Sequence, residues 1–255
     1  MCLIALSWQP ETDTPLVLVA NRDEYFNRPT RYMNAWPDHS GVVAGQDLQA
    51  GGTWFGVNIS NLRFAALTNI RRPIYRDAGR RSRGHLVAGF LTSTLSIEQY
   101  CDQIDQHRSD YSGFNLLLFD SQTMMHFNSE QDPQAVRPGV HALSNASLDS
   151  EDWPKVRSAR TKLARWLEQR KSIEPLAGLL NSRELAVAKD LPETGIEQDI
   201  EQQLSAEFIQ MQGYGTRCST ALIWNTDTIE LLEHSYNPSG QVIHQAAFTF
   251  QQPFD

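Results

Sequence analysis

Residues 2–8 read Cys-Leu-Ile-Ala-Leu-Ser-Trp, a short apolar run that begins with a thiol. A second apolar run, residues 15–20, follows a polar turn, so the two are predicted to pair as antiparallel strands. If Met1 is removed, as is expected when a small residue follows it, Cys2 carries a thiol and a free α-amine. Such a pair can act as nucleophile and base. The alternative is that Cys2 serves only as a small buried hydrophobic residue.

The composition predicts a single domain over residues 1–255, because 255 residues of which 40% are hydrophobic can bury a full core. The net charge of −8 and the pI of about 5.4 disfavour nucleic acid and anionic membranes as partners, since both bind through a positive field. Two basic runs, residues 71–72 and 76–83, are either binding loops for carboxylates or phosphates or simply solvated loops.

The three cysteines, Cys2, Cys101 and Cys218, have no paired spacing, so the sequence predicts neither a disulfide framework nor a metal site. The first apolar run stops at residues 9–11, which is too short for a signal peptide or a spanning helix. We therefore expect a cytoplasmic protein without integral membrane insertion.

The hydrophobic patterns predict strands, then helices, strands, helices and strands. The predicted strands cover residues 3–8, 15–20, 53–59, 63–69, 115–119, 123–127, 219–224, 228–234 and 242–250, and the predicted helices cover 84–92, 96–106, 154–171, 173–180 and 197–211. Ser96 and Gln99 form a capping-box pattern, and the helix that follows places Cys101 on its core face. This order fits an α+β fold with two packed sheets and helices outside them.

Several polar segments adjoin the predicted strands. Residues 21–24, Asn-Arg-Asp-Glu, follow the second strand, where Arg22 and Asp23 either form a pair that orients a neighbouring group or belong to an ordinary turn. Four further segments combine glycine, amide, hydroxyl or guanidinium groups, namely residues 51–57, 67–69, 141–146 and 214–220. These groups could converge at a sheet edge.

Taken together, the segments resemble those of the NRDE family, also called the transport and Golgi organisation 2 (TANGO2) family. The resemblance rests on the Met-Cys start and on residues 21–24, 51–57, 67–69, 82–84, 113–117, 143–146 and 214–220, in one order along the whole chain. It implies the N-terminal-nucleophile hydrolase fold, a four-layer αββα sandwich of two mainly antiparallel sheets.

The family's chemical analogues, the cholylglycine and penicillin V amide hydrolases, imply a catalytic set. By similarity, the set consists of Cys2, Asp23, Asn69, Asn145 and Arg217, with Arg22 beside Asp23. The implied reaction is attack of the Cys2 thiolate on an amide or thioester carbonyl, with the α-amine carrying the proton. Asn69 and Asn145 would stabilise the oxyanion, and Asp23 and Arg217 would position the amine and the thiolate. No metal or cofactor is required for this chemistry.

The resemblance implies a second function of a different class, because family members are linked to haem trafficking and to acyl-CoA handling. Haem or acyl-CoA would then be the ligand, with haem donor or acceptor proteins as partners. Residues that could cover the haem ring, meet its propionates or provide an axial ligand are Tyr32, Trp36, Trp54, Phe55, Arg22, Arg83, Arg217, His85 and His141. We favour the cargo-binding function and leave the hydrolase open as the alternative.

Overall fold

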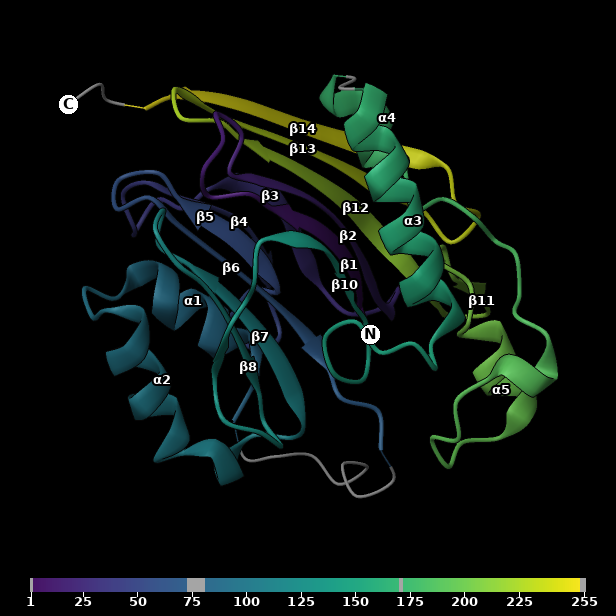
Figure 1. Ribbon diagram of the computed structural model, residues 1–255. Helices are drawn as coiled ribbons and strands as arrows, with labels where there is room; N and C mark the ends of the chain where they lie inside the picture. The colour runs from purple at the N-terminus through teal and green to yellow at the C-terminus, as the bar shows by residue number, and fades with distance from the viewer. Residues whose placement is uncertain (1, 73–80, 170–171, 253–255) are drawn as a thin grey trace. The chain divides into compact units, whose positions relative to one another are not determined.

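The computed structural model describes residues 2–72, 81–169 and 172–252, which belong to two compact units (Figure 1). The first unit consists of Met1–Asn27 and Pro138–Asp255, and the second of Arg28–Arg137. Each unit contains one seven-stranded antiparallel sheet and its own helices. The α+β class with two antiparallel sheets is therefore confirmed, whereas a single domain over residues 1–255 stays a prediction.

The sheet of the first unit has the strand order β10-β1-β2-β12-β13-β14, and β11 pairs with β12. Its strands are β1 (Cys2–Trp8), β2 (Leu16–Tyr25), β10 (Gly139–Leu143), β11 (Gln210–Met211), β12 (Tyr214–Trp224), β13 (Thr228–Tyr236) and β14 (Val242–Gln251). The helices are α3 (Pro154–Gln169), α4 (Ile173–Ala177), α5 (Gln198–Gln203) and the 3-10 helix Ala188–Asp190. Every residue of β1 is buried, which explains its continuous apolar sequence.

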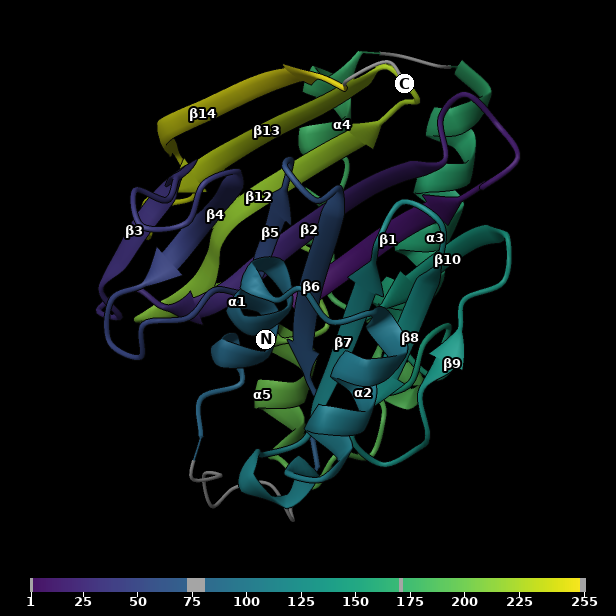
Figure 2. The ribbon, with the colours of Figure 1, turned by 90° about the vertical axis from the view of Figure 1, so that its left-hand side faces the viewer.

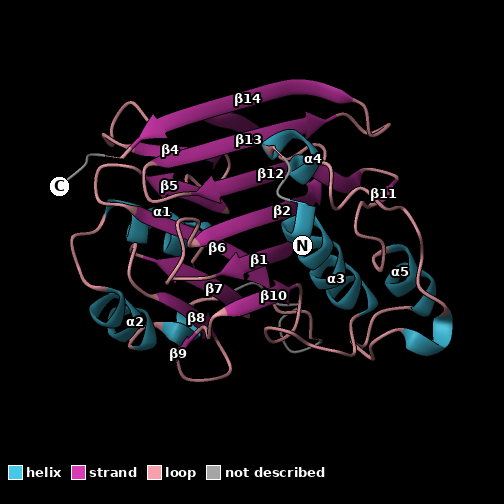
Figure 3. Ribbon diagram, turned by 45° about the horizontal axis from the view of Figure 1, so that its top comes forward, coloured by secondary structure: helices cyan, strands magenta, loops and turns pink. Residues whose placement is uncertain are grey.

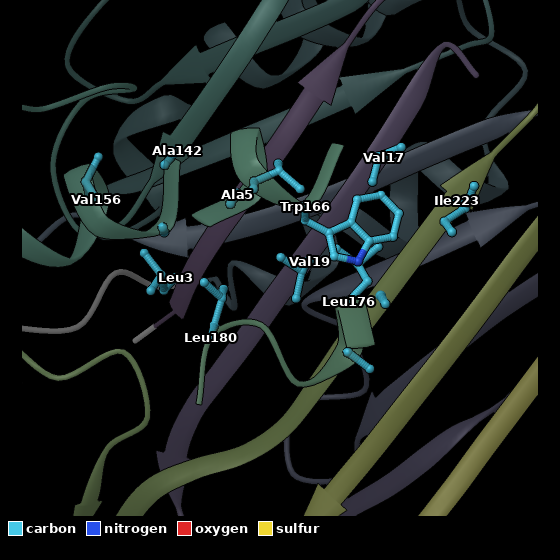
Figure 4. Close-up of a cluster of buried hydrophobic side chains, with 14 of the residues drawn as sticks. Leu3, Ala5, Val17, Val19, Ala142, Val156, Trp166, Leu176, Leu180 and Ile223 are labelled. Carbon is cyan, nitrogen blue, oxygen red and sulfur yellow. The ribbon is translucent and has the colours of Figure 1, made fainter. Parts of the chain in front are cut away.

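Helices α3 and α4 cover one face of this sheet (Figure 3). The core beneath them includes Leu3 and Ala5 of β1, Trp166 of α3 and Leu176 of α4 (Figure 4). Because side chains alternate along a strand, residues 3, 5 and 7 of β1 point to the helix-covered face and residues 2, 4 and 6 to the opposite face. The Cys2 side chain therefore points away from α3.

The sheet of the second unit runs in sequence order from β3 to β9 (Figure 2). Its strands are β3 (Thr30–Ala35), β4 (Val42–Asp47), β5 (Phe55–Asn58), β6 (Arg63–Asn69), β7 (Phe114–Phe119), β8 (Met124–Asn128) and β9 (Gln134–Ala135). The helices are α1 (Gly84–Thr92), α2 (Ile97–Asp105) and the 3-10 helix Arg108–Asp110. The predicted capping box of Ser96 and Gln99 is confirmed, and so is the core position of Cys101, which is 3% exposed.

Some local predictions are wrong. The helix predicted over 197–211 contains only α5 and the short strand β11, because backbone groups of Phe208 and Ile209 bond to Ser182 and Thr216 instead of to a preceding helical turn. Residues 21–24 lie inside β2 and not after it, because β12 pairs with β2 as far as Tyr25. Strands β3, β4, β9, β10 and β11 were not predicted. The helix over 173–180 ends at Ala177.

Two sequence predictions extend past the described residues. Residues 170 and 171 of the predicted helix 154–171, and residues 76–80 of the second basic run, lie outside them. In the part of the chain that the structure describes, no helix is both long enough and apolar enough to cross a bilayer.

Candidate functional site

Cys2 begins a row of side chains that crosses three strands of the first unit. It pairs with Arg22 of β2, and Arg22 pairs on its other side with Cys218 of β12. Residues directly opposite each other in an antiparallel sheet point to the same face, so an arginine stands between two thiols. All three side chains are buried. The strand pairing thus places Arg22 next to Cys2. The sequence predicted this neighbour only through the family resemblance.

The Cys2 thiol is held in its protonated form by its surroundings. Burial is the main cause that raises the pKa of this thiol above its ordinary value, and the Asp23 carboxylate adds to the increase. The charge of Arg22 and the backbone N–H of Asp23 lower the pKa without outweighing burial. A thiol in this state needs a base before it can act as a nucleophile.

Asp23 is fixed by its neighbour on β12. Its Oδ1 accepts a 2.7 Å hydrogen bond from the Thr216 hydroxyl, and both side chains are 1% exposed. The Thr216 oxygen also accepts the backbone N–H of Ile209 at 2.9 Å, and the Tyr214 hydroxyl donates to the Asp23 carbonyl at 3.1 Å. Thr216 and Tyr214 were not predicted individually. Their place in the 214–220 segment was the only signal in the sequence.

Arg217 is the extra residue of a β-bulge, because the register of β12 against β2 shifts between Thr216 and Cys218. Its Nη1 donates to the Tyr25 carbonyl at 2.8 Å, and its guanidinium lies 5.6 Å from the centroid of the Phe26 ring. These contacts place Arg217 beside the last residues of β2. Its predicted role near the thiolate stays a prediction.

Asn145 lies just after β10, the strand that pairs with β1 through Ile4 and Leu143. The Ser144 hydroxyl lies 3.2 Å from the carbonyl oxygen of Cys2 and 3.2 Å from Oδ1 of Asn145. Both Ser144 and Asn145 are buried. Ser144 therefore links the backbone of Cys2 to the predicted oxyanion donor, a role that sequence reasoning missed although the Leu-Ser-Asn segment was noted.

His141 of β10 is paired with a carboxylate. Its Nδ1 lies 2.6 Å from Oδ2 of Asp149, whose Oδ1 accepts the Ala142 N–H at 2.8 Å. Burial alone would raise the pKa of Asp149, but the bonds from His141 and Ala142 and the charge of Arg160 hold this pKa below its ordinary value. Asp149 thereby fixes the imidazole orientation. The role of His141 as a haem ligand stays a prediction.

The remaining predicted residues lie in the second unit. Asn69 ends β6, where it pairs with Phe114, and its oxyanion role stays a prediction. Trp54 packs so closely on Gly45 that a Cβ at Gly45 would lie 2.3 Å from the indole ring.

Arg83 and His85 support loops of this unit. Arg83 Nη1 donates to the Gly113 carbonyl at 3.0 Å, and His85 Nε2 lies 2.6 Å from the carbonyl oxygen of Ala50. His85 is also exposed, so its surroundings lack the enclosure typical of a haem ligand. The predicted cofactor-binding residues are thus divided between the two units, with Arg22 and His141 in the first and Trp54, Arg83 and His85 in the second.

A buried polar cluster in the second unit was not predicted. The Asn115 amide nitrogen donates to the Thr68 hydroxyl at 3.1 Å, and its Oδ1 lies 3.0 Å from both Nε2 of His126 and Nδ2 of Asn128. Asn115 belongs to the 113–117 segment that carried the resemblance. Its place in a buried network gives that segment a structural role, because buried polar groups need hydrogen-bond partners. Across the described ranges, no group of three or more His, Cys, Asp or Glu side chains is arranged to hold a metal ion.

Comparisons with known proteins agree with the resemblance. The family model described as "Transport and Golgi organisation 2" matches residues 1–238. The Transport and Golgi organization protein 2 homolog of Homo sapiens is 30% identical over 254 residues, which cover 89% of this chain and 90% of the human protein. The corresponding homolog of Mus musculus is 29% identical over 250 residues and covers 88% of both chains. Transport and Golgi organization protein 2 of Drosophila melanogaster is 34% identical over 147 residues, or 54% of this chain and 48% of the fly protein. With a match to the family model over nearly its whole length, the chain belongs to the Transport and Golgi organisation 2 family.

Proposed function

We propose that Cys2 is the nucleophile of an acyl-transfer site that hydrolyses a non-peptide amide or a thioester. One observation carries the proposal, namely that Cys2, Arg22, Asp23 and the Ser144–Asn145 pair are all buried where β2 and β10 flank the start of β1. Burying a guanidinium, a carboxylate and an amide near a thiol is costly unless each is bonded, and such polar groups cluster at sites of chemistry.

The proposed reaction begins after removal of Met1. The α-amine of Cys2 takes the thiol proton, and the thiolate attacks the acyl carbonyl to form a carbon–sulfur bond. The bond from the carbonyl to the leaving amine or thiol then breaks, and the proton passes from the α-amine to that leaving group. Water hydrolyses the resulting thioester, which releases the acid and restores the thiol. The α-amine supplies the base that the buried thiol needs because its pKa is raised. The proton moves only between two groups of the same residue.

The neighbouring residues have separate roles in this proposal. The Asp23 carboxylate, fixed by Thr216, would hold the α-amine in place. The Ser144 hydroxyl would hold Asn145 by donating to Oδ1 of its amide. The amide nitrogen of Asn145 would then be the donor to the oxyanion. Loss of one such donor typically lowers kcat by about 10²–10³-fold. The four-layer sandwich and the participation of Asn69 and Arg217 belong to the same proposal.

Two measurements test the hydrolase. The intact mass of the protein purified from cells should show a chain that begins at Cys2. An acyl probe such as a p-nitrophenyl ester should give a burst of one nitrophenolate per chain, and mass spectrometry should place the acyl group on residue 2. Cys2→Ala should abolish the burst. Cys101→Ala is the matched control, because it removes a buried thiol from the second unit and should leave the burst intact. Retention of Met1, or a burst that survives in Cys2→Ala, would overturn the proposal.

A second candidate is supported by the state of the Cys2 thiol. With its pKa raised by burial, the thiol is neutral at pH 7, which suits a pocket that holds cargo without cleaving it. In that case the site would bind haem or an acyl-CoA for transport, with the buried Arg22 available to a carboxylate. The names of the relatives also refer to transport.

Haem titration separates the cargo-binding function from the hydrolase. Cargo binding predicts a saturable shift of the Soret band that weakens in Arg22→Gln and His141→Ala. Both variants are first checked for folding by circular dichroism. His85→Ala is informative as a comparison, since this exposed residue should have little effect if the site lies in the first unit. A titration without a saturable shift would rule out haem as the cargo.

A further inference from the structure

The first unit contains a cavity of about 740 Å³ on the face of the sheet that α3 and α4 cover. Its floor and one wall are apolar and consist of Val17, Ile223, Trp166, Leu167 and Ile173. Figure 4 shows the Trp166 ring beside Val17 and Ile223. This volume is within the range of small-molecule sites, about 300–1,000 Å³.

Two polar groups that line the cavity, the Ser7 hydroxyl and Nε1 of Trp166, lack a hydrogen-bond partner among the described residues. Ser7 also lines the cavity, and it is opposite Val17 in the pairing of β1 with β2. Ser7 is only 3% exposed, and its hydroxyl makes no hydrogen bond to a residue that the structure describes, so it is open to a donor of a ligand. The indole N–H of Trp166 is the buried polar atom of the described lining that lacks a partner, a state that costs about 1–3 kcal/mol.

The rim of the cavity is built from two hairpin loops that are bonded to each other. The Thr14 hydroxyl donates to Oδ1 of Asn225 at 2.8 Å, and the Thr226 N–H donates to the Asp13 carbonyl at 3.0 Å. Within the β1–β2 loop, the Thr12 hydroxyl bonds to the Gln9 carbonyl at 3.0 Å. The rim is therefore held in place before any ligand arrives, which reduces the entropy lost on binding.

The charged side chains among the described residues that line the cavity all have the same sign. Three carboxylates, those of Glu11, Asp13 and Glu230, line it, and the described lining residues include no Lys, Arg or His. None of the three forms an ion pair or a side-chain hydrogen bond within the described ranges. Carboxylates are acceptors only, as is the Ser7 hydroxyl when it meets an ammonium group. The site is thus complementary to a cation with several N–H donors.

We propose that this cavity binds a small organic cation with an apolar body, such as an arylalkylamine. The ring of the ligand would pack on Val17, Trp166 and Ile223, and its ammonium group would face Ser7 and the rim carboxylates. The proposal does not depend on Cys2. Ser7 lies about 17 Å along β1 from Cys2, at about 3.4 Å per residue, and the two side chains point to opposite faces of the sheet.

The test is a titration of the 15N-labelled protein with 2-phenylethylamine, followed by NMR. We expect saturable shifts for the indole N–H of Trp166 and for the amides of residues 9 and 11–14, with a millimolar Kd. Phenylacetate and 2-phenylethanol keep the ring but replace the cation by an anion or a neutral group. Both should bind at least about tenfold more weakly than 2-phenylethylamine, since tenfold corresponds to the loss of one good charged contact.

Variants test whether the carboxylates that line the cavity attract the amine. Glu230→Gln should weaken amine binding about threefold to fivefold, as expected for a partly exposed carboxylate. Asp227→Asn is the matched control, because it removes the same charge from the neighbouring turn but does not line the cavity. Ser7→Val should block the floor and abolish binding, with the spectrum itself reporting whether the variant is folded. Shifts that do not saturate, equal binding of phenylacetate, or equal loss in Glu230→Gln and Asp227→Asn would overturn the proposal.

Discussion

Replacing Thr216 by valine should destabilise the first unit by about 3–5 kcal/mol, although the two side chains have nearly the same shape. The Thr216 hydroxyl donates to Oδ1 of Asp23 at 2.7 Å and accepts the Ile209 N–H at 2.9 Å, in a position that is 1% exposed. A hydrogen bond to a charged group contributes about 1.5–3 kcal/mol, and a buried N–H left without an acceptor costs about 1–3 kcal/mol. Valine removes both interactions while keeping the volume and favouring a strand.

Urea unfolding followed by tryptophan fluorescence measures this loss, with Trp224 of the same strand as a buried reporter. Thr216→Ser is the matched control. It keeps the hydroxyl and removes one methyl group, so it should lose no more than about 1.5 kcal/mol. If the valine variant stays within about 1 kcal/mol of the parent, or if serine is as destabilising as valine, the hydroxyl does not hold Asp23 as the structure indicates.

Three further changes test other parts of the fold. Arg63, which is 8% exposed, donates to the carbonyls of Phe90, Ser93 and Leu95 at the end of α1. Arg63→Ala should therefore lower the free energy of unfolding in urea by about 3–5 kcal/mol. Arg63→Lys should recover little of this loss, because an ammonium lacks the planar fork of a guanidinium. Gly52→Ala should destabilise more than Gly51→Ala by thermal unfolding. A Cβ at Gly52 would lie 2.3 Å from the backbone of Gly84, whereas Gly51 has open space around it and only a φ of 80° to disfavour alanine, at a cost of about 1 kcal/mol. Burial raises the pKa of the Cys101 thiol to about 12, so the folded chain keeps a proton that the unfolded chain loses near pH 8.5. Through this thiol, stability should be constant below about pH 8 and should fall as the pH rises toward 12, and urea midpoints should show a flatter decline above pH 8.5 for Cys101→Ala.

The elements that were predicted correctly have strong local signals. Helices α1 and α2 were bounded to within about two residues because an apolar stripe and a capping box are local properties of the chain. The apolar strands β1, β6 and β7 were identified from continuous hydrophobic runs, as expected for strands that are buried on both faces. The failures have the opposite character. Strand β3 is mostly exposed and polar, so nothing in its own sequence distinguishes it from a loop.

For the candidate site, the sequence suggested candidate residues but not their arrangement. Cys2 was singled out by its position after Met1, and Asp23 and Asn145 by their resemblance to a catalytic set. Which groups hold them depends on pairing between distant segments, since Thr216 is 193 residues from Asp23 and Ser144 is 142 residues from Cys2. Strand register decides such contacts, and register comes from the whole sheet and not from any one segment.

The sequence by itself determined the α+β class and the family and singled out Cys2 as a candidate, because hydrophobic periodicity and ordered motifs are properties of the linear chain. Only the tertiary structure decided that Arg22 lies between Cys2 and Cys218, that burial keeps the Cys2 thiol protonated, and that Ser7 faces a separate acidic cavity. The physical reason is the same in each case. Burial, pKa and charge complementarity depend on groups that the fold brings together from distant parts of the chain.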